Sequence, residues 1–158
     1  MAQLGKIDQK LQELGYPLDR VPKVGAIYQP VVIDGTTVYC AGSVPFDGDV
    51  LTLKGKVPSQ VGLAAAQKGA ALCVANMLRN VRNAVGTLDK VDRILRVMGY
   101  VNCDLDYTEQ HLVINGASQL LVDVFGDKGL HARTAVGMVA LPLGSSVEVD
   151  MILKLKAE

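Results

Sequence analysis

The stretch RTAVGMVALPLGSSVEVD, residues 133–150, decides the fold. Small and apolar residues alternate up to Val139, a Pro/Gly connection interrupts the pattern, and a second strand-like segment resumes at Val147. Two strand patterns joined by so short a connection predict neighbouring strands. The sequence therefore predicts that the regions of Arg133 and Glu148 lie close together.

Arg133 and Glu148 admit two interpretations. A guanidinium is planar and permanently charged, and it binds a carboxylate through two parallel hydrogen bonds. A glutamate between two valines is costly in its ionised form unless it has a partner or a chemical task. The two residues therefore form either a structural ion pair at the rim of a core or a site for a substrate carboxylate. Spacing alone does not decide between them.

Length and composition predict a globular protein. A chain of 158 residues with 49% hydrophobic residues has the size of one domain that can bury its own core. Lys and Arg together number 16, as do Asp and Glu, so no net basic charge attracts nucleic acid or an anionic membrane surface. The least charged apolar stretch, residues 61–78, contains Lys68 and two glycines and is too polar and short to span a membrane.

The cysteines and histidines predict no metal site. Cys40, Cys73 and Cys103 are far apart, odd in number and outside any CxxC motif, and the histidines are His111 and His131. We expect the thiols to be reduced and buried, as in an intracellular protein. No signal-peptide pattern precedes them, which favours a cytoplasmic location. The histidine at 131 follows a glycine-rich segment, and we expect it to be solvated.

Helix and strand patterns alternate along the rest of the chain. The predicted elements are a short amphipathic helix at 6–14, a β-hairpin at 31–40, a long helix at 59–85, a strand at 93–103 and a second long helix at 109–125. Ser59 is the expected N-cap of the first long helix, and Arg79 and Arg82 suit its C-terminal end. Two apolar helix stripes and one sheet predict an α+β layer fold, with both long helices on the same face of the sheet.

Several segments of the chain resemble a known family. They are Arg-Thr-Ala-Val at 133–136, Ala-Leu-Pro-Leu-Gly at 140–144 and Ser-Val-Glu-Val at 146–149. Together they resemble the C-terminal signature of the reactive-intermediate (imine/enamine) deaminases, the YjgF-like or Rid proteins, also labelled L-PSP endoribonucleases. Cys40-Ala41-Gly42-Ser43-Val44-Pro45 is similar to the family's Ser-Gly-Gln-Ile-Pro segment, with Ala41 in place of the serine. Tyr28 matches a tyrosine that in the family reaches the ligand site.

The resemblance covers about residues 24–156 and implies an architecture. It implies a chorismate-mutase-like (YjgF-like) α+β sheet with two long helices packed on one face. The whole chain, 1–158, would be a single domain with an N-terminal helical extension at about 1–20. Members of the family are usually homotrimers with ligand sites in the clefts between subunits.

The resemblance also implies an activity. The expected reaction is that of a 2-iminobutanoate/2-iminopropanoate-type deaminase, which hydrolyses reactive enamine/imine acids to 2-keto acids and ammonia without a cofactor. Arg133 would hold the substrate carboxylate, and the backbone of Gly42 would contact the imine nitrogen region. Glu148, with Tyr28, would orient or polarise the attacking water. The family often has an asparagine near the start of the second long helix, but we expect Asn115 to lie too far from the arginine to take part.

Two other functions compete with the deaminase. The first is a non-catalytic trimer that holds small carboxylates or a partner protein, which the replacement at Ala41 and the altered surroundings of Tyr28 would allow. The second is the endoribonuclease activity in the family label. That activity predicts a basic groove lined by aromatic residues, and the sequence has neither a basic excess nor clustered aromatics.

Overall fold

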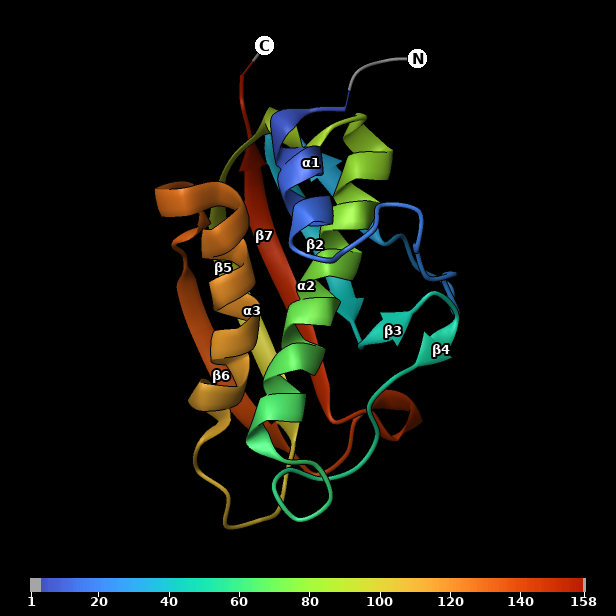
Figure 1. Ribbon diagram of the computed structural model, residues 1–158, viewed down its shortest axis with the longest axis vertical. Helices are drawn as coiled ribbons and strands as arrows, with labels where there is room; N and C mark the ends of the chain where they lie inside the picture. Colours follow the sequence, from blue (N-terminus) through green and yellow to red (C-terminus); the bar gives the residue numbers. More distant parts are fainter. Residues whose placement is uncertain (1–3, 158) are drawn as a thin grey trace.

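A five-stranded sheet with helices on one face organises the protein; the computed structural model describes residues 4–157 (Figure 1). In chain order the elements are α1 (Lys6–Glu13), β1 (Val31–Asp34), β2 (Thr37–Ser43), β3 (Phe46–Asp47), β4 (Val50–Leu51), α2 (Leu63–Val85), η1 (Leu88–Lys90), β5 (Val91–Asn102), α3 (Gln110–Phe125), η2 (Gly126–Gly129), β6 (Ala132–Met138), η3 (Pro142–Gly144) and β7 (Val147–Leu155). The helices α2 and α3 lie side by side against the sheet, which confirms the α+β fold. None of these helices is long and apolar enough to cross a membrane.

The strand order is β1-β2-β7-β5-β6, so the predicted pairing of β6 with β7 is wrong. β5 lies between them, parallel to β6 and antiparallel to β7. The connection from β6 to β7 passes the end of β5, where Cys103 N–H donates to Met138 O and Asn102 N–H donates to Ser146 O. A strand pattern fixes which residues alternate but not which strand pairs with which, and a connection of this length can step past one strand.

The two faces of the sheet differ in what covers them. On β7 the buried residues alternate with half-buried ones, and the buried Val147 touches α2, where an added Cβ at Gly69 would lie 3.2 Å from its Cγ2. Glu148 and its alternate neighbours therefore point to the opposite face, because successive side chains of a strand do. Large apolar side chains on that opposite face are exposed, namely Val32, Tyr39, Val136 and Met138. This uncovered sheet face lies away from the three helices.

The first long helix begins later than predicted. It starts at Leu63 after the N-cap Gly62, and no side chain caps it. Ser59, the predicted cap, instead bonds Asp104 through its backbone N–H at 3.1 Å and its hydroxyl at 2.9 Å. An N-cap prediction from sequence assumes that the side chain bonds its own helix, and here a partner from another part of the chain takes it.

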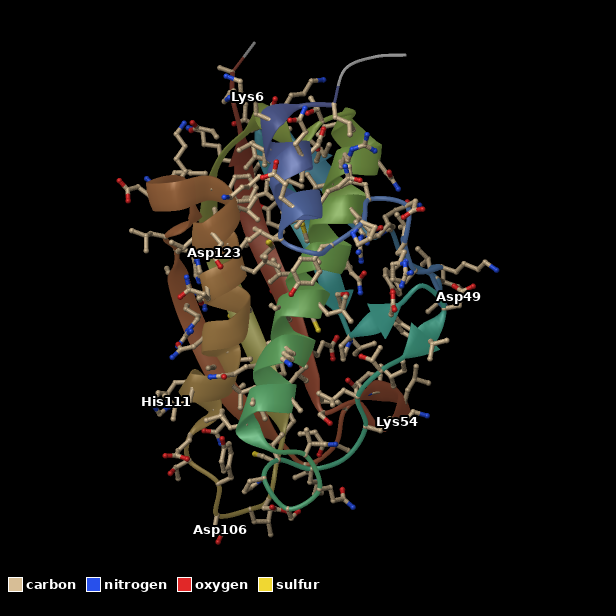
Figure 2. All side chains as sticks on the ribbon, in the orientation of Figure 1. Lys6, Asp49, Lys54, Asp106, His111 and Asp123 are labelled. Atoms are coloured by element: carbon tan, nitrogen blue, oxygen red, sulfur yellow. The ribbon has the colours of Figure 1, made fainter. Side chains whose placement is uncertain are left out.

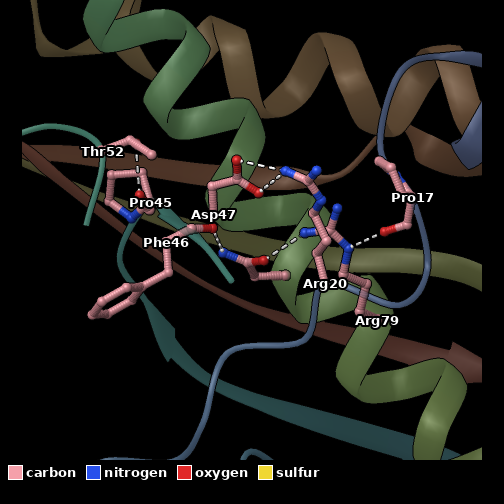
Figure 3. A network of polar contacts seen from close by, with 8 residues as sticks. Pro17, Arg20, Pro45, Phe46, Asp47, Thr52 and Arg79 are labelled. Carbon is pink, nitrogen blue, oxygen red and sulfur yellow. Dashed lines mark hydrogen bonds and ion pairs between the residues drawn. The ribbon is translucent and has the colours of Figure 1, made fainter. Parts of the chain in front are cut away.

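Arg79 is a buried link between segments rather than a solvated charge at a helix end. Its side chain is 1% exposed, its Nε–H donates to Pro17 O at 2.7 Å, and its Nη1 donates to Asn76 Oδ1 at 2.7 Å (Figure 3). The Asn76 amide in turn donates to Phe46 O at 2.9 Å. The expectation that Arg79 serves the helix dipole missed these contacts, because they join α2 to segments distant in the sequence.

A buried carboxylate fastens the predicted N-terminal helix, α1, to the rest of the fold. Asp8 is fully buried and accepts hydrogen bonds from Thr87 Oγ1 at 2.8 Å and Leu88 N–H at 3.0 Å. The Nε of Arg82 lies 3.5 Å from the same carboxylate and has no hydrogen-bond partner. α1 therefore packs on η1 through a fully buried carboxyl group.

Asp8→Ala is expected to lower the free energy of unfolding by about 2–4 kcal/mol, because it leaves the buried N–H of Leu88 without its acceptor and the buried Nε of Arg82 without its ion-pair partner. Urea denaturation measures the loss. Glu13→Ala is the matched control, since Glu13 is an exposed acid on the same helix and its loss should change the stability by no more than about 0.5 kcal/mol. Equal effects of the two substitutions would contradict the anchoring role of Asp8.

Candidate functional site

Three of the four predicted site residues line one pocket. Tyr28, Gly42 and Glu148 surround a cavity of about 520 Å³. The irregular segment at 22–30 forms one wall of the pocket, and the end of β2 forms a second wall. Pro142 and Leu143 of η3 form the third wall. These residues are far apart in the sequence, and the strand order brings them together because β2 pairs directly with β7.

The carboxyl group of Glu148 is half-buried in this pocket. Burial raises its pKa above the ordinary value, and the negative charge of Asp150 raises it further. Asp150 is itself held by the Tyr100 hydroxyl, which donates to its Oδ2 at 2.8 Å. Glu148 therefore keeps its proton to a higher pH than an ordinary glutamate, as groups that accept and return protons in active sites commonly do.

Gly42 brings bare backbone against that carboxyl group. A Cβ added at Gly42 would collide with Oε1 of Glu148 and lie 3.2 Å from its Cδ. The pairing of β2 with β7 is irregular at this point, since its register shifts between Cys40 and Ser43. Bulges of this kind interrupt the ladder and are frequent beside active sites. The irregular strand and the missing side chain together let the Glu148 carboxyl group lie directly against the Gly42 backbone at the pocket wall.

Tyr28 and Ala41 also line the pocket. The Tyr28 side chain comes from the irregular segment before β1 and is about half exposed. Ala41 contributes a methyl group where the resembling family has a serine hydroxyl. Elsewhere in the molecule, the described residues include no group of three or more His, Cys, Asp or Glu side chains placed to hold a metal ion.

Arg133 lies apart from the pocket, contrary to the prediction that it neighbours Glu148. Its side chain reaches α3, on the helix-covered face of the sheet, where Nη2 donates to His111 O at 3.1 Å (Figure 2 labels His111). Glu148 points to the opposite face, and β5 separates β6 from β7. Within one chain, therefore, the two residues are neither an ion pair nor parts of one cavity.

Asn115 contacts Arg133 directly, so the expectation that it lies too far away is wrong. Its Oδ1 accepts from Arg133 Nη1 at 2.9 Å, and Ser118 Oγ accepts from the same nitrogen at 3.0 Å. His111, Asn115 and Ser118 follow one another at helical spacings of four and three, which places them on one face of α3. That spacing was visible in the sequence. The parallel pairing of β5 with β6, which places this face beside Arg133, was not.

These contacts leave one edge of the Arg133 guanidinium available. A guanidinium has five N–H donors, and three of them are used by His111, Asn115 and Ser118. Among the residues that the structure describes, none accepts from the Nε–H or the second Nη2–H. Nε and Nη2 form the side of the guanidinium that binds a carboxylate through two parallel hydrogen bonds. Arg133 is thus held by α3 while its Nε–H and one Nη2–H remain available as donors.

Comparisons with known proteins agree with this fold. The family described as "YjgF/chorismate_mutase-like, putative endoribonuclease" matches residues 8–155. The chain belongs to this family. Protein TCP17 of Trypanosoma cruzi is 33% identical over 152 residues, which are 96% of this chain and 95% of TCP17.

Two solved structures are similar to this chain over most of its length. Atu1372 of Agrobacterium tumefaciens, a protein of unknown function, is 40% identical and superposes with a TM-score of 0.88 over 95% of this chain and 92% of its own. E. coli TdcF with bound serine shares the fold at 19% identity, with a TM-score of 0.60 over 87% of this chain and 94% of TdcF. The predicted YjgF-like family and fold are therefore confirmed.

Proposed function

We propose that this protein hydrolyses 2-imino and enamino acids of the 2-iminobutanoate/2-iminopropanoate type to 2-keto acids and ammonia. The observation that carries the proposal is the half-buried Glu148 carboxyl group, which faces the bare backbone of Gly42 in a small pocket. Membership of a family that includes the Rid deaminases supports the same reaction. The free edge of Arg133 supplies the carboxylate recognition that such substrates need.

The proposed site is completed by a second copy of the chain. Arg133 and Glu148 point to opposite faces of the sheet in one chain, so a single subunit cannot place both around one small acid. In a homotrimer, Arg133 of one subunit would bind the substrate carboxylate in the Tyr28–Gly42–Glu148 pocket of the next. The exposed apolar side chains of the uncovered sheet face support association through that face.

The reaction needs few groups. Arg133 holds the carboxylate and Gly42 admits the imine nitrogen beside Glu148, which places water next to the C=N carbon. Glu148 takes a proton from that water as its oxygen adds to the carbon, and returns the proton to the nitrogen. Collapse of the resulting carbinolamine expels ammonia and leaves the 2-keto acid, so one water is consumed for each ammonia released. The raised pKa of Glu148 suits both proton transfers.

A second candidate is a trimer that binds small carboxylates without turning them over. Ala41 favours it, because this residue removes one hydroxyl from the pocket wall. TdcF, which shares the fold, was crystallised with bound serine. The same pocket and the same arginine would serve either function, so the two differ in turnover and not in where the ligand binds.

The experiment that separates them compares the wild type with Gly42→Ala. We expect the wild type to accelerate keto-acid release from freshly generated 2-iminopropanoate. Gly42→Ala should reduce that rate by about 100-fold or more, because the added methyl displaces the carboxyl group that transfers protons. Gly25→Ala is the control, since Gly25 lines the same pocket and a Cβ there meets nothing within 4 Å.

Circular dichroism and size-exclusion chromatography check that both variants fold and assemble. Binding of pyruvate to the wild type with no acceleration of imine hydrolysis would establish the binding protein instead. Equal activity in Gly42→Ala and Gly25→Ala would contradict the role of the Gly42–Glu148 contact.

A further inference from the structure

Ser118 contacts Arg133, and His131 contacts Ser118. The proposed reaction uses neither residue. Ser118 Oγ lies 2.9 Å from Nε2 of His131, and the other ring nitrogen, Nδ1, lies 2.6 Å from Gly129 O. Ser118 also accepts from Arg133. His131 is half-buried and hydrogen-bonded at both nitrogens, so the expectation that it is merely solvated is wrong.

The direction of each hydrogen bond in this group follows from the chemistry of its members. The carbonyl of Gly129 can only accept, so Nδ1 of His131 must carry a proton. In a neutral imidazole the other nitrogen, Nε2, is then an acceptor. The hydroxyl of Ser118 must therefore donate to Nε2, which leaves its oxygen lone pairs to accept from Arg133. A neutral His131 thus fixes the direction of the Ser118 O–H bond, so that the oxygen of Ser118 faces Arg133 as an acceptor.

The surroundings keep the ring in this neutral form. Burial lowers the pKa of His131 below its usual value, and the positive charge of Arg133 lowers it further, while the contact with Gly129 O acts in the opposite direction. The groups that face the ring from α3 and η2 are Ser118 and the Gly129 backbone, which are uncharged. Arg133 on β6 is the charge that acts on it.

We infer that Ser118 and His131 are positioning residues, which hold Arg133 with its Nε and Nη2 edge turned toward the substrate carboxylate. The inference rests on the proposed function for the identity of that carboxylate. A long arginine side chain loses rotamer freedom when it binds. The acceptor oxygens of Asn115, Ser118 and the backbone at His111 fix the guanidinium before the ligand arrives.

Protonation of His131 reverses the direction of its hydrogen bond with Ser118. An imidazolium donates from both nitrogens, so the Ser118 hydroxyl loses its acceptor and can no longer be fixed toward Arg133. The second positive charge also lies beside the guanidinium, and like charges repel. The Arg133 anchor should therefore weaken as the pH falls below the pKa of His131.

The first experiment measures pyruvate binding by calorimetry in steps from pH 7.5 down to pH 4.5, because the pKa of His131 lies below its usual value. Ser118→Ala should bind pyruvate about fivefold to tenfold more weakly than the wild type at pH 7.5, the range expected for one side chain that must be immobilised on binding. Ser118→Thr, which keeps the hydroxyl, should restore the affinity. Gln119→Ala is the control, because Gln119 is an exposed neighbour on α3 that does not touch Arg133.

The histidine is tested by His131→Gln. The amide oxygen that this substitution introduces can accept from the Ser118 hydroxyl, and the amide does not titrate. The wild type should therefore lose pyruvate affinity as the pH falls through the lowered pKa of His131, and His131→Gln should not. Protonation of Glu148 cannot mimic this result, because removing a negative charge from the pocket strengthens anion binding. An equal loss in both proteins, or unchanged binding in Ser118→Ala, would overturn the inference.

A second measurement keeps the outcome independent of the proposed function. Nitrogen-15 NMR of labelled histidine should show His131 with its proton on Nδ1, an acceptor at Nε2 and a pKa below that of a free imidazole. If the wild type neither accelerates 2-iminopropanoate hydrolysis nor binds pyruvate, the proposed function fails, and the NMR result still decides whether the Ser118–His131 pair is built as described. A His131 ring that titrates as a solvated histidine would overturn the positioning role.

Discussion

Arg133→Ala is expected to lower kcat/KM for 2-iminopropanoate by at least about 100-fold, with the protein still folded. The two charge-assisted hydrogen bonds of the proposed site to the substrate carboxylate would be lost, and each is worth about 1.5 kcal/mol or more, while about 1.4 kcal/mol corresponds to a factor of ten. The fold should survive, because the partners of Arg133 on α3 include the exposed Asn115 and a backbone carbonyl that water can reach. Steady-state kinetics with pyruvate detection measures the effect.

Two substitutions sharpen this result. Arg133→Lys keeps the charge but loses the two-pronged geometry, so it should recover only part of the rate. Arg93→Ala removes an exposed arginine from the neighbouring strand β5 and should leave the kinetics unchanged. If Arg133→Ala retains turnover near that of Arg93→Ala, then Arg133 is not the carboxylate anchor.

The same variant also tests whether the site is shared between subunits. When Arg133→Ala and Glu148→Gln chains are unfolded and refolded together, mixed copies of the proposed trimer would place the intact arginine of one chain beside the intact glutamate of another. At equal amounts and random assembly, about one site in four should contain both native residues. Activity should then reappear from two inactive proteins. A mixture that stays inactive, despite proven mixed assembly, would mean that one chain supplies both groups.

The helices and the α+β class could be predicted because they depend on periodicity. The amphipathic stripe of α2 and the Asp34-Gly35 hairpin signal are local features, and β1 and β2 pair as that signal indicates. Strand order is not local. The Pro/Gly connection before β7 looked like a hairpin, and only the path of the chain past the end of β5 shows that it is a crossover.

In the candidate site, too, the contacts that sequence patterns missed are the ones that depend on strand order. Gly42 and Glu148 meet in one pocket because their strands pair, and the family resemblance had marked both. Asn115 was excluded because its distance in sequence from Arg133 was taken for a distance in space. A helix followed by a parallel strand returns the chain to the same end of the sheet, so residues of α3 and β6 separated by 18 positions can touch.

Glu148→Gln is expected to reduce kcat by about 100-fold to 10,000-fold, the usual contribution of a group that transfers protons in the rate-limiting step. KM should change little, because in the proposed site Arg133 and not Glu148 holds the substrate carboxylate. The amide has nearly the shape of the carboxyl group and can still fill the space against Gly42. Asp34→Asn, at the exposed end of β1, is the control for the loss of a negative charge.

The same substitution should make the protein more stable at neutral pH. The pKa of Glu148 is raised in the folded state, mainly by burial, so ionisation of this group opposes folding. Its contribution to stability is fully present below the unfolded pKa, near 4.5, and is lost as the pH rises through the folded pKa. Glu148→Gln does not ionise and escapes that loss. Its melting temperature should therefore exceed that of the wild type at pH 7.5, and the difference should shrink toward pH 4. A variant that is both inactive and less stable at pH 7.5 would mean that Glu148 serves the fold rather than the reaction, since residues kept for catalysis at a cost to stability show the opposite pattern.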